Sequence, residues 1–264
     1  MGSVSHVPTY TERRSLRFFE GIHGFKRYKG FQGHHFNYWR KNMNMAIEYK
    51  ASKLVEFIKN LPDFHIVDEI DSNYNHIGAT IADAVLQANM KYESHVRPRI
   101  NKIRRNFPEA DTIFGLKRIL SEKTAIDFLN WRGVDRVKRF QAIVDLLSSE
   151  KINTEDDLRC WLMNDINLTK LRRIHGIGPK TIDYFKILTG IQTSAIDRHL
   201  HNFLERANIS VYGYDEAKDV INKAADKMNV PRSHFDHSIW KYMSTGASHA
   251  RGTDDKNLQT RRCT

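Results

Sequence analysis

The stretch from Leu171 to Leu200 constrains the fold of this 264-residue chain more than any other part of its sequence. It reads LRRIHGIGPKTIDYFKILTGIQTSAIDRHL and places a glycine-containing turn between two apolar segments of helical period. Gly176 and Gly178 allow the chain to reverse sharply, because glycine adopts positive φ without steric cost. Pro179 suits the first position of a helix and Gly190 suits the residue just after its end. The stretch therefore predicts a short helix, a tight turn and a second helix.

Helical periodicity continues through most of the remaining sequence, from about Met43 onward. The run over residues 134–150 is the clearest case, with apolar side chains recurring at helical spacing. Thr154 precedes three acids in the first turn of the next run, as expected for a capped helix. Ser121 is similarly placed to cap a helix over residues 121–131. We find no alternating strand pattern and no internal repeat, so the sequence predicts an all-α fold.

The turn at the two glycines has the features of an anion-binding site. The N–H groups at the start of the second helix lack helical partners and point toward any ligand there. Four cations surround this turn: Lys170, Arg172, Arg173 and Lys180. Four apolar residues of the first helix are expected to pack inward: Ile166, Leu168, Leu171 and Ile174.

The net charge of +11 at pH 7 favours a polyanionic partner, nucleic acid before an anionic membrane surface. No apolar run approaches the roughly 20 residues that span a bilayer. The N-terminus has no apolar core of the kind found in secretion signals. We therefore expect a soluble intracellular monomer without membrane contact, in the cytoplasm and nucleoid or in a nucleus.

The chain divides into three predicted regions. Residues 1–43 form a basic extension with interleaved aromatic residues, which we expect either to lie along nucleic acid or to dock onto the main domain. Glycines within it are expected to prevent a long helix. Residues 44–246 form the main helical domain, and residues 247–264 form a polar tail that we expect to be disordered.

Cysteine usage excludes several kinds of site. Cys160 and Cys263 lie far apart and no CxxC pattern is present, which argues against a disulfide framework and against a cysteine-ligated zinc or iron–sulfur site. His23, His34 and His35 show no regular ligand spacing. The sequence thus predicts no metal site and no bound cofactor.

The turn resembles the helix-hairpin-helix DNA-binding motif, whose consensus has the form L-P-G-φ-G-x-x-T/S-A. The matching segment here is IHGIGPKTI, residues 174–182, with His175 in place of the consensus proline. The resemblance implies contacts to the DNA backbone and is compatible with a monovalent cation bound at the hairpin. It assigns DNA binding to the turn and its flanking residues: Lys170, Arg172, Arg173, Gly176, Ile177, Gly178 and Thr181.

The segment SAIDRHLHNFLER downstream resembles the VDTHxxRxxxR segment of endonuclease-III-type DNA glycosylases of the helix-hairpin-helix (HhH-GPD) superfamily. Asp197 matches the catalytic aspartate of that family, His199 the following histidine and Arg206 the final arginine. Lys180 matches the lysine that attacks the sugar in bifunctional members, within a residue or two of the family spacing. The segment VLQANMKY occupies the place where family members plug the hole left by a flipped base, with four candidates: Gln87, Asn89, Met90 and Lys91.

The resemblance covers about residues 45–245 and implies two helical lobes flanking a DNA-binding cleft. It implies a DNA repair enzyme acting on double-stranded DNA that contains a damaged or mismatched base. Asp197 would stabilise the positive charge that develops on the sugar as the base leaves. Lys180 would attack C1′ as a neutral amine, which burial or neighbouring cations favour, and would add abasic-site lyase activity.

Two departures limit what the resemblance implies. Asn202 stands where the family often has arginine, and the C-terminal iron–sulfur cysteines of endonuclease III are absent. The resemblance therefore does not assign oxidised pyrimidines as substrates.

Three alternatives stay open. Asp197 is also placed to act as a simple helix cap. Asp183, on the same helix as Lys180, is an alternative partner that would keep the lysine charged. For the whole chain, the alternatives are a monofunctional glycosylase that uses Asp197 alone and a non-catalytic DNA-binding scaffold. Five aromatic residues are candidates for base stacking or, alternatively, for the core: Trp131, Phe140, Trp161, Tyr184 and Trp240.

Overall fold

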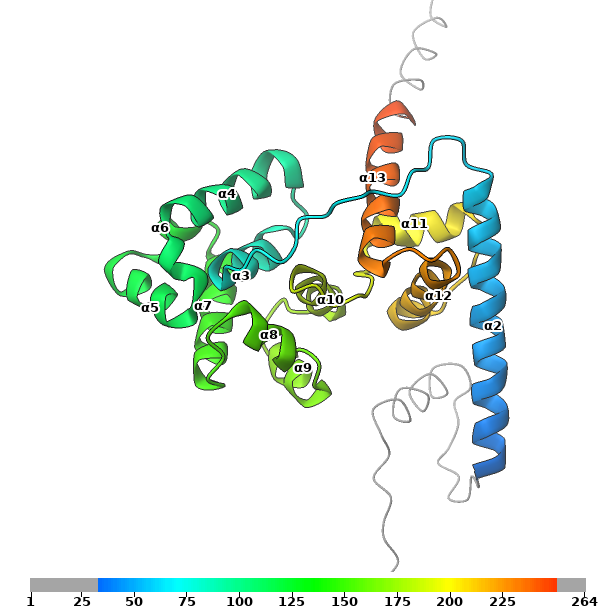
Figure 1. Ribbon diagram of the computed structural model, residues 1–264, viewed down its shortest axis with the longest axis horizontal. Helices are drawn as coiled ribbons and strands as arrows, with labels where there is room; N and C mark the ends of the chain where they lie inside the picture. Colours follow the sequence, from blue (N-terminus) through cyan, green and yellow to red (C-terminus); the bar gives the residue numbers. More distant parts are fainter. Residues whose placement is uncertain (1–32, 251–264) are drawn as a thin grey trace, which may run out of the picture. The chain divides into compact units, whose positions relative to one another are not determined.

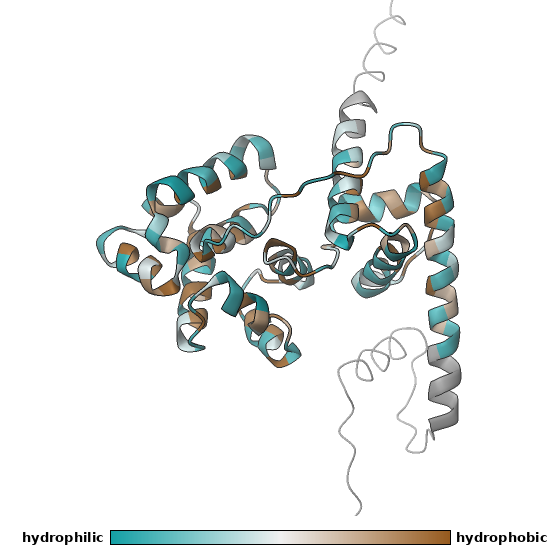
Figure 2. Ribbon diagram, viewed as in Figure 1, coloured by the Kyte–Doolittle hydropathy of each residue, from teal (hydrophilic) through white to brown (hydrophobic). Residues whose placement is uncertain are grey.

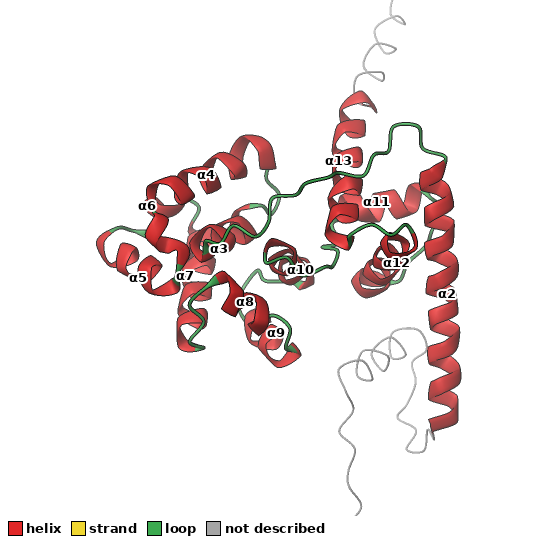
Figure 3. Cartoon of the chain, viewed as in Figure 1, coloured by secondary structure: helices red, strands yellow, loops and turns green. Residues whose placement is uncertain are grey.

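The computed structural model describes residues 33–250, and every regular element within them is helical (Figures 1 and 3). The all-α prediction is thus confirmed for the described part of the chain. The chain divides into two compact units, residues 1–46 and 47–264, which are described separately. None of the helices described is both long and apolar enough to cross a bilayer.

The described part of the first unit consists of residues 33–46, which belong to helix α2 (Gly33–Lys59). The helix was predicted to begin near Met43, and this start was wrong. Residues 34–43 contain no glycine or proline, so nothing in the backbone stops the helix before Gly33, where glycine costs little because it is terminal. Residues 1–32 of the predicted extension lie outside the described residues.

The second unit contains two hydrophobic clusters. The first is built around α3 (Ile77–Leu86), in which every residue is buried. The main neighbours of this helix are α4 (Arg97–Asn106), α7 (Val134–Ser149) and α10 (Pro179–Leu188). The remaining elements around the first cluster are η1 (Tyr92–Val96), η2 (Pro108–Asp111), α5 (Ile113–Glu122), α6 (Ala125–Leu129), α8 (Glu155–Trp161) and α9 (Asp165–Arg172).

The basic residues of α4 lie mainly on its solvated face. Figure 2 shows this helix as hydrophilic over most of its length. Ile100 and Ile103 are its buried residues, whereas Lys102, Arg104 and Arg105 are exposed.

The second cluster joins residues of α2 from Ile47 onward to α11 (Arg198–Arg206), α12 (Gly213–Lys227) and α13 (Arg232–Ala250). Phe203 of α11 is fully buried at its centre. Its ring lies 5.6 Å from that of Phe57, 5.7 Å from that of Phe64 and 5.9 Å from that of Tyr242. These aromatic contacts fix α11, and with it the residue that begins that helix.

Local capping explains where several helices begin. Thr154 forms the predicted capping box at the start of α8, in which its side chain and that of Asp157 satisfy each other's backbone N–H groups. The prediction that Ser121 caps a helix was wrong, because α5 continues through it to Glu122. The Ser121 hydroxyl donates to the carbonyl of Arg118, and Thr124 caps α6 instead.

Two further predictions about packing and extent need correction. Ile166 was expected to pack inward but is 70% exposed, whereas Leu168 and Leu171 are buried. Ile166 precedes Leu168 by two positions, about 200° around the helix, and so lies on the opposite face of α9. The polar tail was expected from residue 247, but α13 continues to Ala250 because residues 247–250 contain no glycine or proline. Residues 251–264 lie outside the described residues.

Candidate functional site

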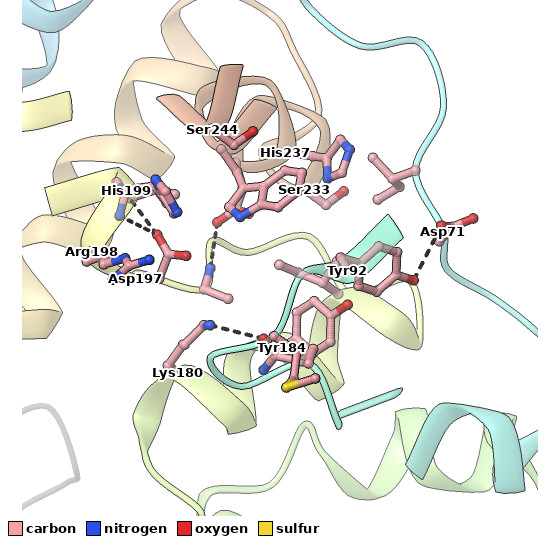
Figure 4. A pocket seen from close by; sticks show the side chains of 18 of the residues that line it. Asp71, Tyr92, Lys180, Tyr184, Asp197, Arg198, His199, Ser233, His237 and Ser244 are labelled. Atoms are coloured by element: carbon pink, nitrogen blue, oxygen red, sulfur yellow. Dashed lines mark hydrogen bonds between the residues drawn. The ribbon is translucent and has the colours of Figure 1, made fainter. Parts of the chain in front are cut away.

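A cavity of about 670 Å³ brings together five segments of the second unit that are far apart in the sequence (Figure 4). Its walls come from the loop at residues 70–71, the segment 87–92, helix α10, the segment 195–200 and helix α13. Seven of the predicted site residues line this cavity: Gln87, Asn89, Met90, Lys91, Lys180, Asp197 and His199.

Lys180 reaches this cavity from the first turn of α10. Gly178 begins the helix and Pro179 occupies its first position, as the sequence predicted. The Lys180 Nζ atom donates a hydrogen bond to Gln87 Oε1 at 3.1 Å. The amine is therefore tied to the end of α3, where Gln87 is the C-terminal cap.

Asp183 does not pair with Lys180, so the alternative that it holds this lysine charged is wrong. Its Oδ2 atom accepts from Tyr214 Oη at 2.7 Å and from Lys218 Nζ at 3.0 Å, both on α12. Asp183 is 3% exposed and lies three positions further along α10, on a face that is turned toward α12.

Asp197 is the N-terminal cap of α11 and also lines the cavity. Its Oδ1 atom accepts from the backbone N–H groups of His199 at 2.8 Å and Leu200 at 3.1 Å. Both bonds use the same oxygen, so Oδ2 is left outside the cap. Asp197 therefore caps α11, as one of the alternatives predicted, and also lines the cavity.

The segment between Gln87 and Lys91 is held by a basic residue from α7. Arg136 Nη2 donates to the Ala88 carbonyl, and its guanidinium lies 4.8 Å from the centre of the Trp131 ring. Asn89 adopts a left-handed conformation with φ of 56°. This turn directs Asn89, Met90 and Lys91 toward the cavity.

The glycine turn between α9 and α10 lies outside the cavity lining. Gly176 has φ of +83°, so its backbone conformation favours glycine, and a Cβ there would lie 1.8 Å from the Arg139 guanidinium and displace it. Arg139 Nε donates to the His175 carbonyl at 2.9 Å. Gly178, in contrast, is extended and faces open space.

The other residues predicted to bind DNA differ in their exposure and in the contacts they make within the fold. Ile177 is 6% exposed and its N–H donates to the Ile174 carbonyl at 3.0 Å, so its side chain and its N–H are both engaged in the fold. Lys170 pairs with Glu150 at 2.5 Å. Arg172 and Arg173 are exposed, and Thr181 is partly buried at the start of α10.

Sequence reasoning missed two acids at this site, one behind the cavity lining and one within it. The first is Asp83, which is fully buried on α3 and accepts hydrogen bonds from three tyrosine hydroxyls. Tyr74 donates to Oδ2 at 2.7 Å, Tyr92 to Oδ2 at 2.9 Å and Tyr184 to Oδ1 at 3.1 Å. Burial raises the pKa of Asp83 to about 6, although the three hydrogen bonds lower it. A single acid in the apolar run of residues 77–86 was the signal that pointed to it.

The second missed acid is Asp236 on α13, which is partly buried and lines the cavity. Its Oδ2 atom accepts from the Ala195 N–H at 2.8 Å. Burial raises the pKa of Asp236 to about 8, and the charge of Asp197 adds to the increase, while the Ala195 bond and Lys180 oppose it. No local pattern in the sequence identifies this residue.

Two aromatic groups of α13 complete the wall around Asp236. The rings of His237 and Trp240 stack with centres 5.4 Å apart, and both line the cavity. Burial lowers the pKa of His237, which favours its neutral form. Of the five aromatic candidates for stacking, Tyr184 and Trp240 line the cavity, whereas Phe140 and Trp161 belong to the first cluster and Trp131 packs against it.

No group of three histidine, cysteine, aspartate or glutamate side chains is arranged to hold a metal ion within the described part of the chain. Cys160 is exposed and is not part of a disulfide.

The chain belongs to the family described as "Domain of unknown function (DUF8548)", whose model matches residues 52–244. The match spans all the residues that line the cavity, from Ile70 to Ser244. Searches against curated proteins and against solved structures found no match. The function must therefore be argued from the geometry of the site.

Proposed function

We propose that the chain is a DNA repair glycosylase of the helix-hairpin-helix superfamily, which flips a damaged or mismatched base out of duplex DNA and cleaves its N-glycosidic bond. One observation carries the proposal. The cavity joins Lys180, Asp197 and the segment from Gln87 to Lys91, three parts of the sequence that the resemblance assigns separately to nucleophile, carboxylate and wedge. If the three short segments resembled the family only by chance, there would be no reason for all three to line one cavity.

Asp197 is suited to stabilise the sugar cation that forms as the glycosidic bond breaks. Its Oδ1 atom is fixed by two backbone N–H groups, so the carboxylate needs little reorganisation when charge develops beside Oδ2. The same carboxylate can accept a proton from an attacking water or amine.

Lys180 is suited to form a covalent intermediate. Its amine would attack C1′, form a Schiff base after the base leaves, and allow β-elimination to cut the strand. The hydrogen bond from Lys180 to Gln87 holds the amine beside the segment that would fill the space left by the flipped base.

The remaining features suit a duplex ligand. The exposed Arg172 and Arg173 lie beside the turn before α10, where free N–H groups favour a phosphate. The elements of the two hydrophobic clusters would form the two lobes that flank the DNA cleft.

Two alternatives each have one observation in their favour. The Lys180–Gln87 hydrogen bond suits a monofunctional glycosylase in which the lysine only positions the wedge segment. The capping bonds of Asp197 suit a non-catalytic DNA-binding scaffold, which would keep this residue for its helix alone.

Borohydride trapping on duplexes that contain uracil, mismatched thymine, 8-oxoguanine, oxidised pyrimidines or alkylated purines tests the proposal. We expect a covalent adduct with the unaltered chain and with Lys59→Gln, an exposed lysine on α2, but none with Lys180→Gln. Asp197→Asn should lower base release by at least about 10²-fold while duplex binding persists.

The outcomes separate the alternatives. Base release without an adduct would leave the monofunctional enzyme, and an adduct that survives Lys180→Gln would overturn the assignment of the lyase activity to Lys180. Duplex binding without release of any base by the unaltered chain would favour the scaffold. Unchanged base release by Asp197→Asn would remove the mechanism as stated.

A further inference from the structure

The cavity contains a second carboxyl group that the proposed mechanism does not use. Asp236 faces the cavity from α13, and the N–H of Ala195 fixes its Oδ2 atom from the segment that leads to Asp197. This is the one hydrogen bond that Asp236 makes within the described residues, so its Oδ1 atom remains available to a ligand.

The surroundings of Asp236 keep it protonated near neutral pH. Burial raises its pKa to about 8, and two ionised carboxylates in one cavity would repel each other. Other charged or titratable groups line the cavity with it: Lys180 on α10, Asp197, Arg198 and His199 at the start of α11, His237 on α13, and Asp71 and Lys91 in the loops. The charge of Asp183 on α10 also acts on it.

We propose that Asp236 is the general acid of the site and transfers its proton from Oδ1 to the departing base. This inference rests on the proposed glycosylase function and extends it to the class of substrate. When a glycosidic bond breaks, positive charge develops on the sugar and negative charge on the departing base. The fixed carboxylate of Asp197 would stabilise the first, and a neutral acid at Asp236 would protonate the second.

The proton and electron balance is complete without a further reactant. The bond between C1′ and the base nitrogen breaks and its electron pair leaves with the base. The Asp236 proton moves to a ring nitrogen or exocyclic oxygen of that base. Water or the Lys180 amine forms the new bond to C1′ and loses a proton to Asp197, and exchange with solvent restores both carboxyl groups.

The arrangement selects a chemical class of base. An uncharged base is a poor leaving group until it gains a proton, so it depends on the acid. An alkylated purine that already carries a positive charge leaves without protonation and gains nothing from Asp236. The site therefore suits uncharged damaged or mismatched bases.

Single-turnover excision with the variant Asp236→Asn tests this assignment. Asparagine keeps the size of the side chain and the acceptor for Ala195 but has no proton to transfer. Duplexes that contain uracil, hypoxanthine or 8-oxoguanine are compared first, and the base that the unaltered chain releases fastest is chosen. For that base, we expect the rate constant of Asp236→Asn to be about 10²-fold lower. On N7-methylguanine, a cationic base, any rate should change less than about threefold. Asp145→Asn, on the exposed face of α7, is the matched control.

The pH profile gives a second, independent readout. Because only protonated Asp236 is active, the rate constant of the unaltered chain should fall as the pH rises through about 8. This alkaline decrease should be absent from Asp236→Asn. Difference infrared spectroscopy of the free protein should also show a carboxylic-acid C=O band that titrates near pH 8 and is missing from the variant.

Each outcome decides a different question. An equal rate and pH profile in Asp236→Asn, or release of N7-methylguanine alone, would overturn the general acid and leave the glycosylase in place. Release of no base by the unaltered chain would overturn the proposed function and this inference with it. An infrared band unchanged in the variant would show that the titrating acid is another residue and would overturn the assignment by itself.

Discussion

Two acids lie at or beside the cavity, and they differ in how many hydrogen-bond partners each has. Asp236 lines the cavity, whereas Asp83 is buried behind Tyr92 and Tyr184 of the lining. Asp83 has both oxygens occupied by the hydroxyls of Tyr74, Tyr92 and Tyr184. Asp236 has one oxygen bonded to Ala195 and the other open to the cavity. Burial raises the pKa of both, to about 6 for the first and about 8 for the second.

The comparison shows that a raised pKa alone does not identify a chemical role. A buried carboxylate with both oxygens hydrogen-bonded holds surrounding elements in place, here η1, α3 and α10. A buried carboxyl group with an unused oxygen facing a cavity can still bind or transfer a proton. The two acids therefore predict different responses to mutation.

Asp83→Ala should cause the largest loss of stability. The change leaves three partly or fully buried tyrosine hydroxyls without their shared acceptor, and the free energy of unfolding should fall by about 3–5 kcal/mol. Asp83→Asn keeps one acceptor oxygen and should lose roughly half as much. Asp236→Ala removes a single hydrogen bond and should change stability by less than about 1.5 kcal/mol.

Urea unfolding of the three variants measures these differences. If Asp83→Ala and Asp236→Ala were equally destabilised, the distinction between a structural and a chemical acid would not hold.

The sequence predicts the elements of this site better than the contacts between them. The glycines and proline of the turn placed α10 correctly, because they restrict the backbone locally. The Schellman arrangement at Gly190, where its N–H donates to the Ile187 carbonyl, is local in the same sense. Lys180 and Asp197, which both line the cavity, could be singled out because their motif residues lie close in the sequence.

The remaining site residues depend on tertiary packing. Asp236 reaches the cavity only because α13 packs along α11, and no residue near it signals this. The tyrosines around Asp83 come from a loop, from η1 and from α10, so their convergence has no local pattern. The predictions for Ile166 and Ser121 were wrong for the opposite reason, because each residue matched a local pattern. Leu168 and Leu171 are the buried residues of α9, and Thr124 is the cap of α6.

Asp236→Asn should alter the pH dependence of stability. The folded chain holds a proton on Asp236 up to about pH 8, whereas the unfolded chain releases it near the ordinary pKa of 3.8. Protons are thus lost on unfolding between these values, so this group's contribution to stability is complete below about pH 4 and falls as the pH rises to 8. The variant lacks this dependence.

The stability advantage of Asp236→Asn over the unaltered chain should therefore grow from pH 4 to pH 8 and then stay constant. We expect about 2 kcal/mol at the plateau, less than full linkage gives, because the cavity admits solvent to the carboxyl group. Thermal unfolding across this range, with Asp145→Asn as control, measures it. An advantage that does not depend on pH would mean that Asp236 holds no extra proton.

Tyr184→Phe and Tyr92→Phe each remove one hydrogen bond to Asp83, so that this acid has fewer partners, as Asp236 does. Tyr184 is the one donor to Oδ1 within the described residues, whereas Oδ2 keeps Tyr74 when Tyr92 is changed. Tyr184→Phe should therefore reduce stability by about 1.5 kcal/mol and Tyr92→Phe by about 0.5–1 kcal/mol. Each lost hydrogen bond also removes an influence that lowers the pKa of Asp83, so its infrared titration should move above about 6 and toward that of Asp236. A titration that stayed in place in both variants would mean that burial alone sets the pKa of Asp83, and that its partners do not distinguish it from Asp236.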